Sequence, residues 1–250
     1  FNVEIGLGLK SNSWVGALYW QRAVDEGLSL DDLLDRSDVA VVGIDGGGLA
    51  ALLGLSVTGR AKETKDWLHW AKAWAHPEVM KRKEIAPTLR DFAADGDLVL
   101  IGEDEPTRAI TEVADIVERI LNCRLLPDEG AVGRDPMGVS ALVDEMAGRG
   151  VDHKMMVAVA QGYRLSPAIW GMERKLKNGT LRHGGTRMMN WVLGNAKSEQ
   201  RGSAVLITKE AAGKAKIDPL MASFNAFMLM ARNPAAAVSA ISIPANYRVA

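Results

Sequence analysis

Apolar residues follow two different rhythms along this chain of 250 residues. Three largely apolar runs come first, at residues 38–45, 52–60 and 66–76, and short segments containing glycine or charged residues connect them. Such connections favour neighbouring antiparallel strands. Trp67 is out of phase with Trp70 and Trp74, so we expect it on the opposite face of the sheet. The pattern therefore predicts a three-stranded meander.

From residue 77 onwards, helical and strand patterns alternate. Strands are predicted at 97–102, 130–135, 154–160 and 203–209, and helices at 77–94, 106–125, 136–150, 166–177, 187–200 and 218–233. Alternation of this kind builds a parallel sheet through right-handed crossovers. Three antiparallel strands followed by parallel strands, with helices on both faces, is the element order of an α/β ribonuclease-H-like (resolvase/integrase-like) fold with a mixed sheet.

The chain is predicted to contain one α/β domain with two flanking segments. Residues 1–37 form a helical lead-in, in which Ser29 is the expected N-cap of a short helix, and residues 38–232 form the domain. Residues 233–250 are rich in alanine and proline and are expected to be irregular. Because the chain begins with Phe1 rather than methionine, we expect it to be part of a longer protein.

Composition excludes some classes of protein, and the charge distribution suggests a partner. The single cysteine excludes an internal disulfide and favours a reducing compartment, and no apolar run approaches the roughly 20 residues of a membrane span. The net charge is −1, but residues 164–216 hold eleven lysines and arginines against three acids, a local charge of +8. Such an excess marks either a polyanion-binding face or a set of solvated helix faces.

Three aspartates occupy comparable places in the predicted elements. Asp45 closes the first strand, Asp135 closes the strand at 130–135, and Asp218 begins the last long helix. Strand ends and helix starts meet at one edge of an α/β sheet, so these carboxylates can converge. Clustered carboxylates suit Mg²⁺ and Mn²⁺, which prefer oxygen ligands. Each aspartate also has a structural interpretation: Asp45 and Asp135 as turn residues, and Asp218 as an N-cap.

The histidines and the phosphate-binding motifs give weaker signals. No GxxxxGK[ST] loop is present, which excludes an ordinary P-loop ATPase. His183 lies in RHGG within the basic segment, where a phosphate contact and a structural role both stay open. His69 and His76 lack metal-binding spacing and are interpreted as structural.

Five stretches of the sequence together resemble the C-terminal nuclease domain of the large terminase subunit of tailed double-stranded-DNA phages and prophages. They read VVGIDGGGL, WAHPEVMKRKEIAPTLRDF, VGRDPMGV, HGG followed by NWVLGNAK, and ITKEAAGKAKIDPLMASFNAFMLM. The last is the most specific, and the resemblance spans roughly residues 1–232. It implies a metal-dependent endonuclease that cuts concatemeric viral DNA at the start and end of packaging, with little sequence specificity.

The resemblance also implies roles for single residues. Asp45, Asp135 and Asp218 would be the catalytic, metal-binding aspartates. We expect Asp45 to bridge two Mg²⁺ or Mn²⁺ ions and the other two to hold one each, so that one ion activates the attacking water and the other stabilises the leaving 3′ oxygen. The candidates for contacts with the DNA backbone are Arg187, Lys209, Lys214, Lys216 and His183.

Partners and setting follow from the same resemblance. It implies double-stranded DNA, a DNA-pumping ATPase domain, a portal protein and a small terminase subunit, in the cytoplasm of the host bacterium and without a membrane. Residues 1–37 would then link this domain to an ATPase domain that the present chain lacks.

One departure from the family pattern concerns Ala50 and Ala51. Related terminases often carry another acid about six residues after the first aspartate, and LDDLL would look native where this chain reads LAALL. We therefore expect these alanines to replace acids and to impair the nuclease, as an engineered change would. The alternative is a natural variant whose alanines pack against apolar neighbours.

Two rival functions stay open from the sequence. GIDGGG resembles the phosphate-binding hairpin of actin-like and sugar-kinase ATPases, although those proteins place Thr or Ser where Leu49 stands. The second rival is a non-catalytic DNA-binding or docking module that uses the basic segment. Metal-dependent nicking of DNA would exclude both.

Overall fold

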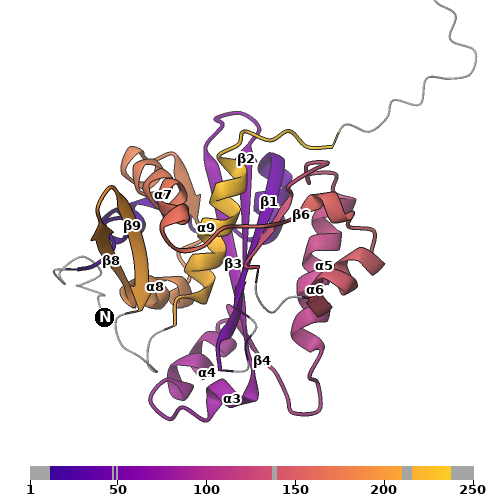
Figure 1. Ribbon diagram of the computed structural model, residues 1–250, viewed down its shortest axis with the longest axis vertical. Coiled ribbons are helices and arrows are strands. Elements are labelled where there is room, and N and C mark those ends of the chain that lie inside the picture. Colours follow the sequence, from indigo (N-terminus) through magenta and orange to yellow (C-terminus); the bar gives the residue numbers. More distant parts are fainter. Residues whose placement is uncertain (1–11, 47, 49, 137–139, 210–215, 238–250) are drawn as a thin grey trace, which may run out of the picture.

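Three long antiparallel strands form the centre of the fold (Figure 1). The computed structural model describes residues 12–46, 48, 50–136, 140–209 and 216–237. The strands are β1 (Ser37–Gly46), β2 (Leu52–Ala61) and β3 (Trp67–Ala75). β1 pairs with β2 and β2 with β3, with Asp45 opposite Gly54. The predicted meander is therefore confirmed.

Four short strands extend the meander into a seven-stranded mixed sheet. β4 (Leu98–Leu100) and β7 (Leu181–His183) run parallel to β3 at its two ends. β5 (Val132–Arg134) runs parallel to β1, and β6 (Met156–Ala158) parallel to β5. The order along the sheet is β4-β3-β2-β1-β5-β6. This is the ribonuclease-H-like arrangement that the element order predicted.

Helices cover both faces of the sheet (Figure 1). One face packs against α2 (Leu30–Arg36), α5 (Arg108–Asn122) and α6 (Ser140–Gly148). The other face packs against α7 (Ser166–Asn178), α8 (Arg187–Gly194) and α9 (Asp218–Met230). The remaining helices are α1 (Ala17–Trp20), α3 (Pro77–Met80), α4 (Ala86–Ala94), and the 3₁₀ helices η1 (Gln21–Ala23), η2 (His153–Met155) and η3 (Gly162–Leu165). Among the described residues, no helix is long and apolar enough to cross a membrane.

The strand pleat divides the buried side chains between two hydrophobic cores. Along β1, Val41 enters the core beneath α7 to α9, whereas Val42 enters the core beneath α2 and α5. Trp67 packs against the first core, and Trp74 belongs to the second, as their phase along β3 predicted. The lead-in contributes Trp14 and Trp20, both fully buried, to the first core.

Glycines let α9 lie directly on the backbone of β1 and β2. A Cβ atom on Gly43 would lie 1.9 Å from the Ala222 carbonyl oxygen, and one on Gly54 would lie 2.7 Å from the Pro219 nitrogen. Any side chain at either position would push the helix away. The apolar helix therefore starts close to the end of β1, and this brings Asp218 to Asp45.

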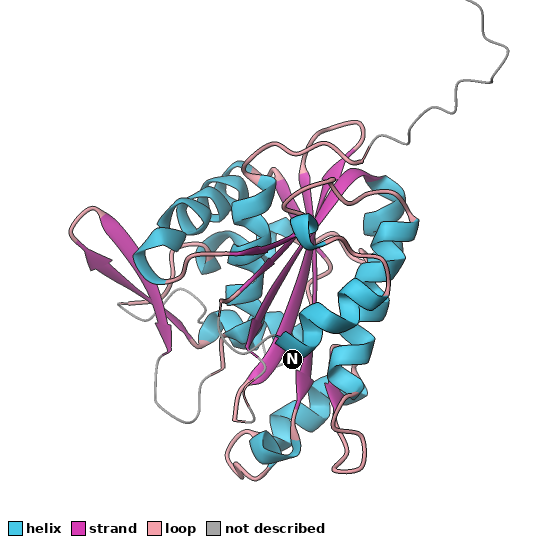
Figure 2. Ribbon diagram, turned by 45° about the vertical axis from the view of Figure 1, so that its right-hand side comes forward, coloured by secondary structure: helices cyan, strands magenta, loops and turns pink. Residues whose placement is uncertain are grey.

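Several sequence predictions are wrong in detail. The helix expected at 187–200 ends at Gly194, and residues 196–201 form strand β8. The strand expected at 203–209 is β9 (Ala204–Lys209), but within the described part of the chain it pairs only with β8, in a separate hairpin (Figure 2). β7 was not predicted at all. The helix expected at 77–94 is broken into α3 and α4.

Candidate functional site

Three separate elements bring three aspartates to one cavity. Asp45 lies at the end of β1 and Asp135 directly follows β5, and these two strands pair in parallel up to Ile44 and Arg134. Asp218 is the first residue of α9. A Cβ atom added to Gly46, the residue after Asp45, would lie 3.5 Å from the Cβ atom of Asp218. All three aspartates line one cavity of about 200 Å³. Its other lining residues are Gln161, Gly162, Leu165, Ile169, Leu206, Ile207, Lys209, Ile217 and Met221.

Asp218 does not cap its helix, contrary to the structural interpretation of this residue. Ile217 occupies the N-cap position, and its side chain makes no capping hydrogen bond. Asp218 is 5% exposed, and its Oδ2 atom has no hydrogen-bond partner among the residues that the structure describes. A buried polar atom without a partner is costly. An unpaired carboxylate oxygen beside two further carboxylates is what an oxygen-preferring cation would bind.

Among the three aspartates, Asp45 has a strongly raised pKa. Burial, followed by the negative charges of Asp218 and Asp135, raises the pKa of Asp45 to about 7, and Lys209 opposes the shift. Carboxylates in such a group repel one another, and a divalent cation relieves that repulsion. No three His, Cys, Asp or Glu side chains within the described residues are arranged to hold a metal ion as they stand. The donor chemistry nevertheless fits Mg²⁺ or Mn²⁺ at this cavity.

Lys216 lies beneath the turn between β1 and β2 rather than on the surface. Its side chain is 2% exposed, and Nζ donates a hydrogen bond to the backbone carbonyl of Ala50. This bond connects the turn to the segment that leads into α9. This burial and this bond give no support to the predicted contact between Lys216 and DNA.

Ala50 and Ala51 are not part of either core. Ala50 is exposed, Ala51 is half-buried, and the Ala51 N–H donates to the Gly48 carbonyl at 2.8 Å. Neither alanine belongs to the buried hydrophobic clusters. The interpretation of LAALL as apolar packing therefore does not fit these two positions.

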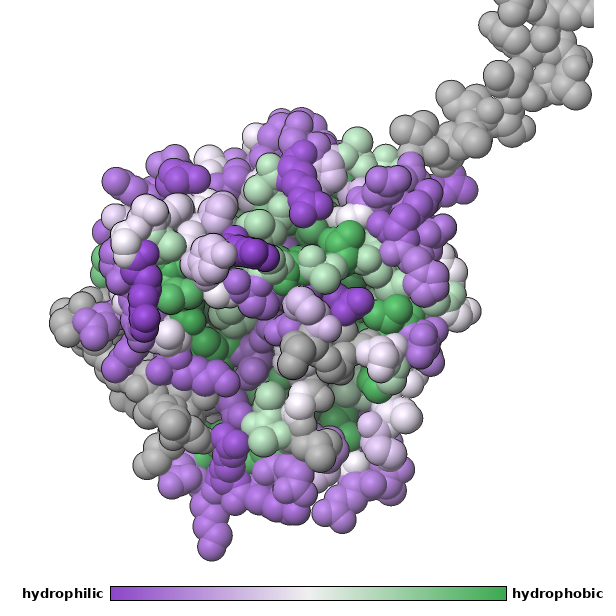
Figure 3. Space-filling view, in the orientation of Figure 1, coloured by the Kyte–Doolittle hydropathy of each residue, from purple (hydrophilic) through white to green (hydrophobic). Residues whose placement is uncertain are grey.

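The other basic candidates differ in their surroundings. Lys209 is exposed and lines the aspartate cavity. Arg187 is also exposed, but its Nη1 pairs with Asp95 at 2.9 Å. Lys214 lies outside the described residues. On the face shown in Figure 3, hydrophilic residues gather mainly around the rim, and hydrophobic residues are visible in the recesses nearer its centre. Of the basic candidates for a DNA contact, Lys209 is the one that lines the aspartate cavity among the described residues.

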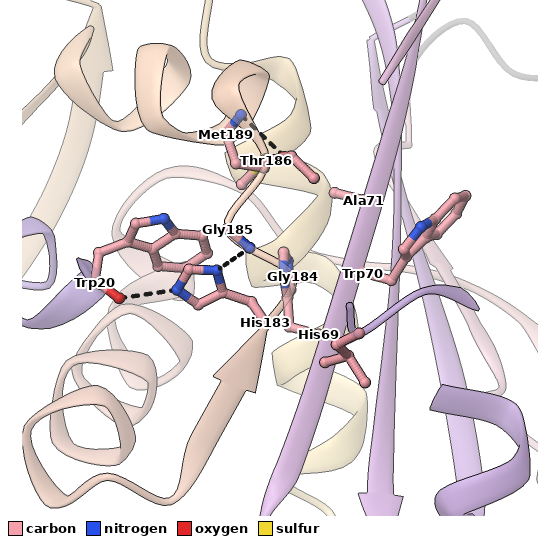
Figure 4. A pocket seen from close by; sticks show the side chains of 10 residues that line it. Trp20, His69, Trp70, Ala71, His183, Gly184, Gly185, Thr186 and Met189 are labelled. Atoms are coloured by element: carbon pink, nitrogen blue, oxygen red, sulfur yellow. Dashed lines mark hydrogen bonds between the residues drawn. The ribbon is translucent and has the colours of Figure 1, made fainter. Parts of the chain in front are cut away.

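His183 is buried in a polar contact with the lead-in (Figure 4). Its Nδ1 accepts from the Gly185 N–H at 3.0 Å, and its Nε2 donates to the Trp20 carbonyl at 2.9 Å. The ring stacks on Trp20 at 3.6 Å, and burial lowers the pKa of His183 to about 4. The adjacent cavity of about 10 Å³ holds one water at most. A neutral, buried imidazole gives no support to the predicted phosphate contact.

Two amide side chains that the sequence did not single out support the site. The Nδ2 of Asn225, on α9, donates to the Ile44 carbonyl at 2.8 Å, next to Asp45. Its Oδ1 accepts from the Nε2 of Gln161, which lines the cavity, at 3.0 Å. The signal was a lone asparagine in the apolar stretch SFNAFMLM. Buried amides of this kind fix the spacing of the elements that they join.

Comparison with known proteins adds a family and a fold. A family model described as "Terminase large subunit, endonuclease domain" matches residues 103–233. The crystal structure of the HK97 bacteriophage large terminase is similar, with TM-score 0.59 and 17% identity over 81% of this chain and 43% of that chain. The chain therefore spans less than half of that relative. No curated protein matches the sequence.

Two structures of the large terminase nuclease of thermophilic phage G20c are more distant. One has TM-score 0.46 and 11% identity, over 76% of this chain and 81% of that chain. The other contains bound magnesium and has TM-score 0.42 and 12% identity, over 76% and 80%. At these levels of identity, the HK97 structure supports the fold, and the G20c structures carry no further argument.

Proposed function

The chain belongs to the family of terminase large-subunit endonuclease domains, and from this premise we propose that it cuts concatemeric viral DNA during genome packaging. The observation that carries the proposal is the cavity where Asp45, Asp135 and Asp218 meet from β1, the end of β5 and the start of α9. We assign the catalytic role to these three aspartates.

The aspartates would hold two divalent ions, Mg²⁺ or Mn²⁺. When bound, these ions supply water activation and charge stabilisation at the scissile phosphate. The protein's own contribution is to position the carboxylates. Asn225 joins α9 to the end of β1, and Lys216 joins the turn after Asp45 to the segment before Asp218. Lys209, which is exposed and lines the cavity, would pair with a DNA phosphate.

Ala50 and Ala51 stand where we propose that an active enzyme carries acids. Both lie in the turn that follows Asp45, and Ala50 is exposed. A carboxylate at position 50 would add negative charge near the metal-binding aspartates and an acceptor near the Lys216 ammonium. Loss of such a neighbouring group typically costs about 10–100-fold in metal affinity or activity. We therefore expect the present chain to be a weak nuclease.

Plasmid nicking tests the proposal. Supercoiled plasmid is incubated with Mn²⁺ and either the present chain, Ala50→Asp/Ala51→Asp, or the same double variant with Asp218→Asn added. We expect the double variant to nick at least 10-fold faster than the present chain, and the triple variant and an EDTA control to be inactive. If neither the chain nor the double variant nicks DNA that both bind, a non-catalytic docking module replaces the nuclease.

The packaging context is part of the proposal. We propose that residues 1–37 link the nuclease, at 38–232, to a DNA-pumping ATPase domain, and that 233–250 form an irregular tail. The partners would be double-stranded DNA, the portal protein and the small terminase subunit, in the cytoplasm of the host bacterium. The ATPase rival receives no support from the family match, which describes an endonuclease domain.

A further inference from the structure

An exposed aromatic residue and an arginine stand at the rim of the aspartate cavity. Tyr163 and Arg164 lie on η3, between the cavity-lining residues Gly162 and Leu165. The Tyr163 side chain is 61% exposed, and the Arg164 guanidinium lies 5.7 Å from the centre of its ring. Arg164 makes no ion pair with an acidic residue in the described part of the chain, so its charge is available to a ligand.

The turn that carries this pair is fixed from both sides. Before it, the Nε2 of Gln161 donates to the Val159 carbonyl and to Asn225 Oδ1, both at 3.0 Å. After it, the Ser166 Oγ donates to the Tyr163 carbonyl at 2.7 Å and accepts from the Val205 N–H at 3.0 Å. The exposure of Tyr163 therefore belongs to an ordered turn, and a ligand would not have to order it.

We propose that Tyr163 and Arg164 bind the DNA strand that enters the cavity. This role rests on the proposed nuclease function. The Tyr163 ring would pack on a sugar or base beside the scissile phosphate, and the Arg164 guanidinium would pair with a neighbouring phosphate. Aromatic contacts of this kind tolerate any base, and arginine binds phosphate without reading sequence. The pair thus suits an enzyme with little sequence specificity.

Salt-dependent DNA binding separates the two contributions. The whole chain, with EDTA, is titrated into a fluorescein-labelled 20-base-pair duplex at several salt concentrations, and anisotropy is recorded. Arg164→Gln is expected to lower the slope of log Kd against log salt by about 1. Tyr163→Ala is expected to weaken binding about tenfold at every salt concentration without changing the slope. Tyr163→Phe should bind like the unaltered chain.

Two control variants match these changes elsewhere. Leu18→Ala removes another exposed apolar side chain, 53% exposed on α1, and Arg36→Gln removes a charge next to the opposite end of β1. Both should leave affinity and slope unchanged, and melting temperatures verify that every variant folds.

Unchanged binding by Arg164→Gln or by Tyr163→Ala would overturn the rim proposal, as would an unaltered chain that binds no DNA. The nuclease function fails separately, when DNA is bound but the acid-restored variant does not nick it.

Discussion

At the scale of single residues, three carboxylates lie close together in the cavity, and the described part of the chain does not fully neutralise their negative charge. Asp218 is buried with one oxygen that no described residue pairs, and Asp45 has its pKa raised to about 7 by burial and by the other two aspartates. Such an arrangement destabilises the metal-free fold. Functional sites commonly carry this cost, and removing the strained group then stabilises the protein at the expense of activity.

Asp45→Asn is therefore expected to raise the stability of the metal-free chain and to abolish its response to metal. In EDTA at pH 7.5, the free energy of unfolding should rise by on the order of 2–3 kcal/mol, because a neutral amide replaces a buried charge near two carboxylates. Urea unfolding measures this change, and a Mn²⁺ titration of the melting temperature measures the response.

The matched control is Asp144→Asn, an exposed carboxylate on α6, which should change stability by less than about 0.5 kcal/mol and keep the Mn²⁺ response. An Asp45→Asn protein that is less stable in EDTA, or that still responds to Mn²⁺, would contradict this account of the cavity.

The same scale shows what the sequence could and could not predict. The convergence of Asp45, Asp135 and Asp218 followed from their positions at element ends, which topology brings together. The burial of Lys216 and His183 could not be predicted, because it depends on the turn at Ala50 and on Trp20, neither of which is close in sequence. A basic residue in a basic segment was expected on the surface, and tertiary contacts buried it instead.

At the scale of elements, the close packing of α9 on the sheet sets the spacing of the site. Gly43 and Gly54 leave room for the helix backbone, and His69 on β3 bonds to the Ser223 Oγ of α9 at 2.8 Å. The start of α9 is thus held against β2, and Asp218 with it. Displacement of this helix by a few tenths of an ångström would move one metal-binding carboxylate relative to the other two.

Gly54→Ala in the acid-restored background tests this dependence. Its methyl group would lie 2.7 Å from the Pro219 nitrogen and 2.8 Å from the Asp218 carbonyl carbon, so the start of α9 must shift. We expect nicking to fall at least 10-fold, and the free energy of unfolding to fall by about 1–3 kcal/mol. Plasmid nicking and urea unfolding measure the two effects.

Gly171→Ala on α7 is the control, because a Cβ atom there meets nothing within 4 Å. Within a helix this change should be neutral or stabilising by up to about 1 kcal/mol and should leave nicking unchanged. Equal effects of the two substitutions would show that close packing at Gly54 does not set the site.

Strand β8 shows that the local amino-acid composition can predict the wrong secondary structure. Residues 196–201 read AKSEQR, a composition that favours a helix, yet they form β8. The reason is the partner strand, since β9 offers an antiparallel partner to every residue from Ala196 to Arg201. Pairing of this kind overrides intrinsic propensity. The meander was predictable, in contrast, because each of its strands is long and closely connected to the next.

At the scale of the whole molecule, a buried polar contact joins the lead-in to the sheet and to α9. His183 bonds to the Trp20 carbonyl, and the Asp25 N–H donates to the His183 carbonyl at 2.9 Å. His69 lies nearby and bonds to Ser223. Burial lowers the pKa of His69 to about 3 and that of His183 to about 4. Both imidazoles therefore stay neutral in the folded chain at pH values where the unfolded chain protonates them.

This difference predicts how stability depends on pH. As pH falls below about 6.5, the unfolded chain takes up protons on both histidines that the folded chain does not accept, so each lowers stability by up to about 1.4 kcal/mol per pH unit. Asp45 acts in the opposite sense, because its raised pKa of about 7 lets the folded chain keep a proton that the unfolded chain has released.

Because two histidines lower the free energy of unfolding on acidification and one aspartate raises it, the net effect is a loss of stability. Between pH 6 and 5 in EDTA, the unaltered chain should lose about 1.4 kcal/mol per pH unit, and Asp45→Asn, which lacks the opposing group, about 2.8. Asp45→Asn/His183→Gln should return to about 1.4, since one histidine remains. Urea unfolding at half-unit pH intervals measures the three slopes. An Asp45→Asn protein whose stability is flat or rises on acidification would mean that the two histidines do not stay neutral in the fold.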